Sequence, residues 1–250
     1  TNISRKNYAF FIEDEWWILD NFALTGAVRY EHDEKYGGEV TPRLYAVWNI
    51  DDAWTMKGGI STGYRTPNIR QTVADWGQIT GQGTAVIYGN PNLKAEKSTN
   101  YEISFNFSPN DQLSIDATAF YTKFKDKINE IRLCSSNCAG GYRFISTNTN
   151  VDKADLKGLE LAAQWNPIET LKLSSSYTYT KTEQKSGLNK GKPLNRMPEH
   201  AVNVRADWQA TGQANVWTQL NYRGKEIETN SRAGKEIGYQ YPSYTIVDIG

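Results

Sequence analysis

The most informative stretch of the sequence is Leu171-Lys-Leu-Ser-Ser-Ser-Tyr-Thr-Tyr-Thr180. Leu, Leu, Ser, Tyr and Tyr occupy the odd positions, and Lys, Ser, Ser, Thr and Thr occupy the even ones. A period of two places successive side chains on opposite faces of a β-strand, so this stretch predicts a strand with one largely apolar and one polar face. Similar alternation recurs at residues 101–107, 113–122, 159–166 and 202–208. No segment has a sustained helical period, and we therefore expect an all-β protein.

The connections between these strands have two lengths. Short polar turns are expected at residues 19–21, 49–52, 108–112, 166–170 and 210–213. Longer connections are expected near residues 33–39, 65–95, 130–148, 184–198 and 227–241. An alternation of short and long connections is typical of an antiparallel up-and-down transmembrane barrel, with short periplasmic turns and long extracellular loops.

Tryptophans gather beside the short turns: Trp16, Trp17, Trp48, Trp54, Trp165 and Trp208. Each could simply pack beneath its turn. Six at one class of turn favour the aromatic girdle that barrels place at a membrane interface.

Eleven strands are expected, at residues 6–17, 22–32, 40–50, 53–64, 96–107, 112–129, 149–165, 171–183, 199–209, 214–226 and 242–250. Strand edges in lipid must be paired, and bacterial barrels close with an even number of strands. We therefore expect this chain to be part of a larger barrel.

Composition narrows the function further. Hydrophobic residues make up 38% of the chain and aromatic residues 12%, while Lys plus Arg equals Asp plus Glu at 28 each. The zero net charge gives no reason to expect nucleic acid as a partner. A mean hydropathy of −0.65 excludes a transmembrane helix, although barrel strands average out as polar. With only His32 and His200, and with no nucleophile motif or phosphate loop, we expect no catalytic residues and no metal site.

The two cysteines lie in Cys134-Ser-Ser-Asn-Cys138. This spacing suits a small disulfide loop and favours an oxidising compartment. Half of a zinc site is the alternative, but neither histidine is near in sequence.

Two motifs resemble a known family. Gly58-Gly-Ile-Ser-Thr-Gly-Tyr-Arg-Thr-Pro-Asn-Ile-Arg70 and Gly89-Asn-Pro-Asn-Leu-Lys-Ala-Glu-Lys-Ser98 are similar to the barrel signature of TonB-dependent outer-membrane receptors. Stretches that resemble the branch of the colicin I receptor and the ferric catecholate receptors are residues 122–129, 157–160, 177–184, 198–200 and 222–225. The resemblance covers nearly all of the chain.

The resemblance implies a 22-stranded barrel plugged by an N-terminal domain. Residues 1–250 would then be about half of the barrel domain, without the plug, its TonB box or the C-terminal strands. It also implies uptake of ferric catecholate siderophores across the bacterial outer membrane, energised through TonB, with colicins or phages as opportunistic ligands. The ferric siderophore would be cargo, and no covalently bound cofactor is expected.

A ferric tris-catecholate is a trianion with aromatic rings, so its site should combine arginines with aromatic side chains. The first long loop offers Arg65, Arg70, Trp76 and Tyr88 against one acid, Asp75. The next offers Arg132, Tyr142 and Arg143 against Glu130. The third holds Lys185, Lys190, Lys192 and Arg196. A mouth lined in this way would attract an anion.

Several alternatives stay open from the sequence. The three lysines of the third loop could be solvated or bind lipopolysaccharide phosphates, and Arg65 could pair with an acid of the plug. The aromatic loop residues could serve packing alone. The chelate could be haem or another iron complex, although the long loops contain no histidine. A passive porin would not need the signature motifs or a loop as long as residues 65–95.

Overall fold

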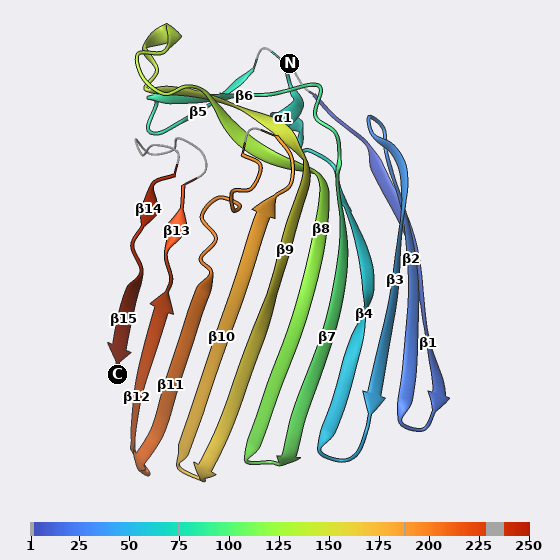
Figure 1. Cartoon of the computed structure of the whole chain (residues 1–250), viewed down its shortest axis with the longest axis vertical. Coiled ribbons are helices and arrows are strands. Elements are labelled where there is room, and N and C mark those ends of the chain that lie inside the picture. Colours follow the sequence, from blue (N-terminus) through green and yellow to red (C-terminus); the bar gives the residue numbers. More distant parts are fainter. Residues whose placement is uncertain (1–2, 75, 188, 229–237) are drawn as a thin grey trace.

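The computed structural model describes residues 3–74, 76–187, 189–228 and 238–250. Its main feature is one curved antiparallel sheet, drawn in Figure 1. The path of eleven sequential strands is β1 (Asn7–Leu19), β2 (Phe22–Asp33), β3 (Gly37–Asn49), β4 (Trp54–Arg65), β7 (Glu96–Asn110), β8 (Leu113–Cys134), β9 (Phe144–Ile168), β10 (Leu171–Gln184), β11 (His200–Thr211), β12 (Ala214–Arg223) and β15 (Tyr244–Ile249). The predicted all-β, antiparallel architecture with eleven strands in sequence order is confirmed. Within the described residues the sheet is open, because β1 and β15 each pair with one neighbour along this path.

The remaining elements belong to the long connections. They are α1 (Ile69–Thr72), β5 (Gly77–Thr80), β6 (Ala85–Tyr88), the 3-10 turn η1 (Ala139–Gly141), β13 (Glu226–Ile227) and β14 (Gln240–Tyr241). In Figure 1 the long connections lie at the upper edge of the sheet and the short turns at the lower edge. In the described part of the chain, no helix has the length and apolar character needed to span a membrane.

The sheet has an apolar face and a polar face, as the period of two predicts. Leu161 on β9 and Val204 on β11 belong to the apolar face and remain 38% and 46% exposed. On the polar face, Ser104 and Thr118 share a hydrogen bond of 2.8 Å across β7 and β8. Tyr45 Oη donates to Glu102 Oε1 at 2.6 Å on the same face. A barrel wall turns such an apolar face to lipid and such a polar face to the lumen.

The six tryptophans beside the short turns keep between 41% and 62% of their surface exposed. Trp16 pairs with Leu24, and Trp165 pairs with Leu113, so both belong to the apolar face. Trp17 is the exception, because it is adjacent to Trp16 and therefore points to the polar face. The other five form a row at the lower edge of the apolar face, where a membrane-interface girdle is expected.

One predicted long connection, at residues 33–39, is wrong. β2 and β3 pair as far as Asp33 and Gly37, which leaves a turn of residues 34–36. The fully buried Asp33 stabilises this turn, because its Oδ1 accepts the backbone N–H groups of Lys35 (2.9 Å) and Tyr36 (3.3 Å). Its other oxygen lies 3.0 Å from Arg5 Nε.

The predicted connection at residues 130–148 is also too long. β8 and β9 continue to pair up to Cys134 and Ile145, so the connection shrinks to residues 135–143. The extension carries the two strands well above their neighbours (Figure 1). Of the predicted connection at 227–241, residues 229–237 lie outside the described part of the chain.

Candidate ligand site at the long-loop edge

The first long loop begins with a capped helical turn. Asn68 is the N-cap of α1: its Oδ1 accepts the N–H of Gln71 at 2.9 Å, and Gln71 Oε1 accepts the N–H of Asn68 at 3.0 Å. This reciprocal pair satisfies backbone donors that the start of a helix leaves unpaired. Pro67, directly before the cap, is completely buried. The Thr-Pro-Asn signature therefore fixes the short turn that carries Arg70 on its exposed side.

The second signature motif returns this loop to the sheet. A Cβ atom on Gly89 would lie 2.2 Å from the carbonyl oxygen of Val73, so only glycine permits this close approach. Asn90 donates its backbone N–H to Gln71 O at 2.7 Å and its side-chain amide to Asn148 O at 2.9 Å. These contacts fasten the loop to itself and to β9.

Between the two signatures lies a hairpin that sequence reasoning missed. β5 and β6 pair from Gly77 with Tyr88 to Thr80 with Ala85, around a turn at residues 81–84 whose first three residues have positive φ. β6 then pairs in parallel with the start of β9, from Ala85 with Phe144 to Tyr88 with Thr147. The signal available was the β-branched pair Ile79-Thr80 before Gly-Gln-Gly and the apolar run Ala85-Val-Ile-Tyr88 after it.

This pairing joins the first and second long loops into one unit, which we call the loop platform (residues 66–95 and 135–143). The backbone N–H of Arg143 donates to Thr84 O at 2.7 Å, and Ala85 and Val86 are buried beneath the contact. In Figure 1, β5 and β6 cross the upper ends of β8 and β9.

Asn150 of β9 is the polar centre of the platform's attachment. Its Oδ1 accepts the N–H of Lys94 at 2.9 Å, and its Nδ2 donates to Lys94 O at 3.0 Å and to Asp126 O at 2.7 Å. Asp126 has a φ of +55° and lies between Lys125 and Lys127, which pair with Lys153 and Val151 of β9. One side chain thus connects the end of the first loop with both long strands.

Two of the predicted ligand arginines have interaction partners within the chain. Arg65, which keeps 65% of its side chain exposed, lies 3.2 Å from the carboxylate of Glu96 on the neighbouring strand. The side chain of Arg132 is 7% exposed, donates to Ser146 Oγ at 2.6 Å and lies 3.3 Å above the ring centre of Phe144. Both arginines therefore connect neighbouring strands of the wall next to the platform.

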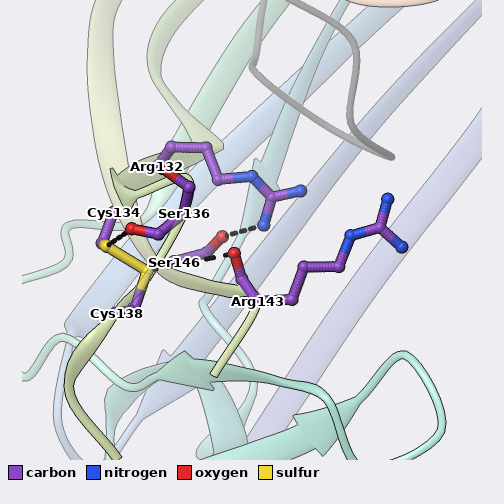
Figure 2. The surroundings of a disulfide bond; sticks show 6 residues. All are labelled: Arg132, Cys134, Ser136, Cys138, Arg143 and Ser146. Atoms are coloured by element: carbon purple, nitrogen blue, oxygen red, sulfur yellow. Dashed lines mark hydrogen bonds between the residues drawn. A yellow bond between two sulfur atoms is a disulfide. The ribbon is translucent and has the colours of Figure 1, made fainter. Parts of the chain in front are cut away.

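The second loop is closed by the disulfide between Cys134 and Cys138, whose Cα atoms are 5.8 Å apart (Figure 2). The N–H of Cys138 donates to Tyr142 O at 3.2 Å, which completes a compact loop. Figure 2 shows the guanidinium groups of Arg132 and Arg143 extending in the same direction. Arg143 is exposed at the surface and Tyr142 is partly exposed.

The remaining predicted residues lie on the surface of the platform. Arg70 is exposed, Trp76 is 41% exposed and Tyr88 is 38% exposed. Tyr88 is held through its backbone, because its carbonyl oxygen accepts Thr147 Oγ1 at 3.1 Å. Asp75, the predicted acidic neighbour, lies outside the described residues.

The third loop is less cationic than its sequence suggests. Lys185 lies 2.6 Å from Glu183 and 3.8 Å from Asp155. Arg196 pairs with the completely buried Glu228 at 3.2 Å and donates to Tyr241 Oη at 2.7 Å. Burial opposes the charge on Arg196, but the hydrogen bonds to Tyr241 and Glu228 outweigh this effect and raise its pKa above the ordinary value.

An open sheet with an apolar and a polar face, tryptophans at one edge and long loops with exposed arginines at the other is the arrangement expected of part of a membrane β-barrel wall. The chain belongs to the family described as TonB dependent receptor-like, β-barrel, whose model matches residues 1–250. The predicted family is confirmed, and the chain is part of an outer-membrane protein.

Relatives agree with this assignment. The iron-regulated outer membrane virulence protein of Vibrio cholerae is 44% identical over the whole chain, which covers 38% of that protein. The ferric enterobactin receptor of Pseudomonas aeruginosa is 30% identical over 89% of the chain and 31% of its own length. A crystal structure of a variant of that receptor superposes with a TM-score of 0.77 at 26% identity, covering 98% of this chain and 37% of the other. The chain thus spans less than two fifths of these relatives.

Proposed function

We propose that the protein containing this chain is an outer-membrane receptor and active transporter for a ferric siderophore of the catecholate class. The observation that supports this most directly is the loop platform. It presents Arg70, Arg143, Trp76 and Tyr88 as exposed groups at the edge of the barrel wall. The likeness to ferric enterobactin receptors points to the same class of cargo.

The chemistry of the platform suits such a cargo. Guanidinium groups provide planar, permanent positive charge for an anionic chelate, and aromatic faces stack on catechol rings. Tyr142, on the rim of the disulfide loop, completes the proposed contact set. We assign Arg65 and Arg132 a positioning role, because Arg65 already pairs with Glu96 and Arg132 already donates a hydrogen bond to Ser146. The function is transport rather than catalysis.

The proposed partners follow from the family. TonB would supply energy through a plug domain, as the resemblance implies, so that capture at the platform is the step that these residues perform. The outer-membrane lipid, including lipopolysaccharide, would surround the apolar face. A colicin that binds the same exposed loops is a further proposed partner.

The test is a tryptophan-fluorescence titration of the full-length receptor with a ferric tris-catecholate, a ferric trihydroxamate and haem. We expect tight binding of the catecholate alone. Arg70→Ala and Arg143→Ala should each weaken it about tenfold, the equivalent of ~1.4 kcal/mol. Arg205→Ala is the matched control, because Arg205 pairs with Asp207 on β11, away from the platform.

Two outcomes would contradict the proposal in different ways. Tight binding of haem or the hydroxamate instead would overturn the cargo class. Catecholate affinity that is unchanged in both arginine variants would overturn the platform as the site of capture.

A further inference from the structure

A cluster of lysines lies on four adjacent strands near the long-loop edge. The strand register arranges it in three rows: Lys97, Lys125 and Lys153; then Lys123, Asp155 and Glu183; then Tyr121, Lys157 and Lys181. Lys185 follows directly after β10 and lies 3.8 Å from Asp155. We call these seven lysines the lysine cluster.

The cluster is on the apolar face, outside the proposed ligand site. Along β9, Lys153 and Lys157 share their face with Leu159, Leu161 and Trp165, because all are separated by even numbers of residues. Arg65, at the end of β4, belongs to the polar face, since it pairs with Glu96, the residue next to Lys97. The cluster therefore faces the surrounding membrane rather than the lumen.

The height of the cluster matches a membrane boundary. Ten residues separate Trp165, at the lower edge, from Asp155 within the cluster. At a rise of ~3.3 Å per residue and a strand tilt of ~40°, this corresponds to about 25 Å, the height of the apolar band of outer-membrane barrels. Tyr101 and Tyr121 stack directly beneath the cluster, with ring centres 6.3 Å apart, where a second aromatic girdle is expected.

The cluster carries excess positive charge. All seven lysines are exposed. Among the described residues that line the two cavities, Asp155 and Glu183 are the only carboxylates. Lys97 pairs with Glu39, and Lys185 pairs with the two cluster carboxylates. Among the described residues, no carboxylate pairs with the other five: Lys123, Lys125, Lys153, Lys157 and Lys181. Like charges directly opposite each other on a sheet repel, so these rows are complementary to an anion.

The two cavities indicate the kind of anion. One, of about 540 Å³, is lined by Lys123, Lys125 and Lys153 among others, and the second, of about 360 Å³, by Lys157 and Lys181. They adjoin each other, because Tyr121, Asp155 and Lys185 line both. Lysine binds phosphate as a point charge, and two neighbouring cationic cavities fit two phosphates carried by one headgroup.

We infer that the lysine cluster binds the two phosphates of a diphosphorylated glycolipid, the lipopolysaccharide of the outer leaflet. The inference rests on the family and its membrane location and is independent of the proposed cargo. The sequence suggested lipopolysaccharide contacts for Lys185, Lys190 and Lys192 of the third loop. Of these, only Lys185 belongs to the cluster, whose other six lysines lie on the strands.

The experiment measures binding of diphosphoryl lipid A to the full-length receptor in detergent by native mass spectrometry. The variant Lys125→Gln/Lys153→Gln removes two lysines that lie directly opposite each other. The control Lys57→Gln/Lys172→Gln removes the same charge from the polar face. At roughly fivefold per lysine near an anionic lipid surface, the cluster variant should bind at least about tenfold more weakly, and the control within about twofold of the unaltered receptor.

Equal weakening in the cluster and control variants would overturn the inference, and so would phosphatidylglycerol binding as tightly as diphosphoryl lipid A. Should the double variant fail to assemble, Lys157→Gln alone is expected to weaken lipid A binding about fivefold, and an unchanged affinity would refute the site. Affinity for the ferric catecholate should stay constant in every cluster variant, which separates failure of this inference from failure of the proposed function.

Discussion

Replacing Asn150 with alanine should detach the loop platform from the wall without unfolding the sheet. Asn150 makes three side-chain hydrogen bonds, two to the backbone of Lys94 and one to the carbonyl oxygen of Asp126. A hydrogen bond contributes about 1 kcal/mol net, so the two bonds to Lys94 together stabilise the attachment by about 2 kcal/mol. The β8–β9 ladder does not depend on this side chain, because its pairing is between backbone groups.

Hydrogen exchange in the full-length receptor measures this change directly. The backbone amides of Asn90 and Leu93 are suitable probes, because their acceptors, Gln71 O and Asn90 O, lie within the loop itself. A loss of about 2 kcal/mol in local opening free energy corresponds to roughly thirtyfold faster exchange. The amides of β8 and β9 should keep their protection.

The control is Asn203→Ala, which removes a side-chain hydrogen bond to Asn221 at 2.6 Å on the polar face, away from the platform. Exchange at Asn90 and Leu93 should be unchanged in this variant. Acceleration of less than about threefold in Asn150→Ala would refute the view that one side chain carries the attachment, because β6–β9 pairing would then suffice alone.

Two further predictions concern the glycine of the second signature and the tryptophan row. Gly89→Ala places a methyl group 2.2 Å from the carbonyl oxygen of Val73, so proteolysis within residues 66–95 should accelerate, whereas Gly212→Ala, where a Cβ has nothing within 4 Å, should not change it. Equal proteolysis of the two variants would contradict the close-approach argument. Trp165→Ala should lower the free energy of unfolding in lipid vesicles by about 2 kcal/mol, as measured by urea titration. Trp17→Ala, on the polar face, should lower the free energy of unfolding by clearly less. Equal losses in the two variants would argue against a lipid-facing row of tryptophans.

The strands could be predicted because their signal is local. The alternation of apolar and polar residues within a segment predicts a strand, and residues 171–180 show this alternation within ten positions. The five short turns are equally local, since Asn, Asp, Pro and Gly favour tight reversals. The error at residues 33–39 also has a local cause: a polar run reads as a loop unless one knows that Asp33 accepts two backbone N–H groups in the turn that follows it.

The platform could not be predicted in the same way. Its central contact is the parallel pairing of β6 with β9, two segments nearly 60 residues apart in the sequence. No periodic pattern within either segment predicts this pairing. Arg65 and Arg132 are the residue type expected to contact an anionic ligand. In the folded chain, however, Arg65 forms an ion pair with Glu96, and Arg132 donates a hydrogen bond to Ser146. The partners that distinguish Arg65 and Arg132 from Arg70 and Arg143 are a property of the folded chain.

Two neighbouring residues of β7, Glu96 and Lys97, have side chains on opposite faces of the sheet. Glu96 faces the polar side, where it pairs with Arg65, and the next residue, Lys97, joins the lysine cluster on the apolar side. A shift of the strand register by one residue would exchange the two faces and deliver the cluster to the lumen. The Glu96 side chain opposes such a shift of β7 against β8, because it also accepts the N–H of Ile128 on β8 at 2.6 Å. Glu96, which pairs with Arg65 directly before the first long loop, therefore also helps to fix which charges meet the membrane.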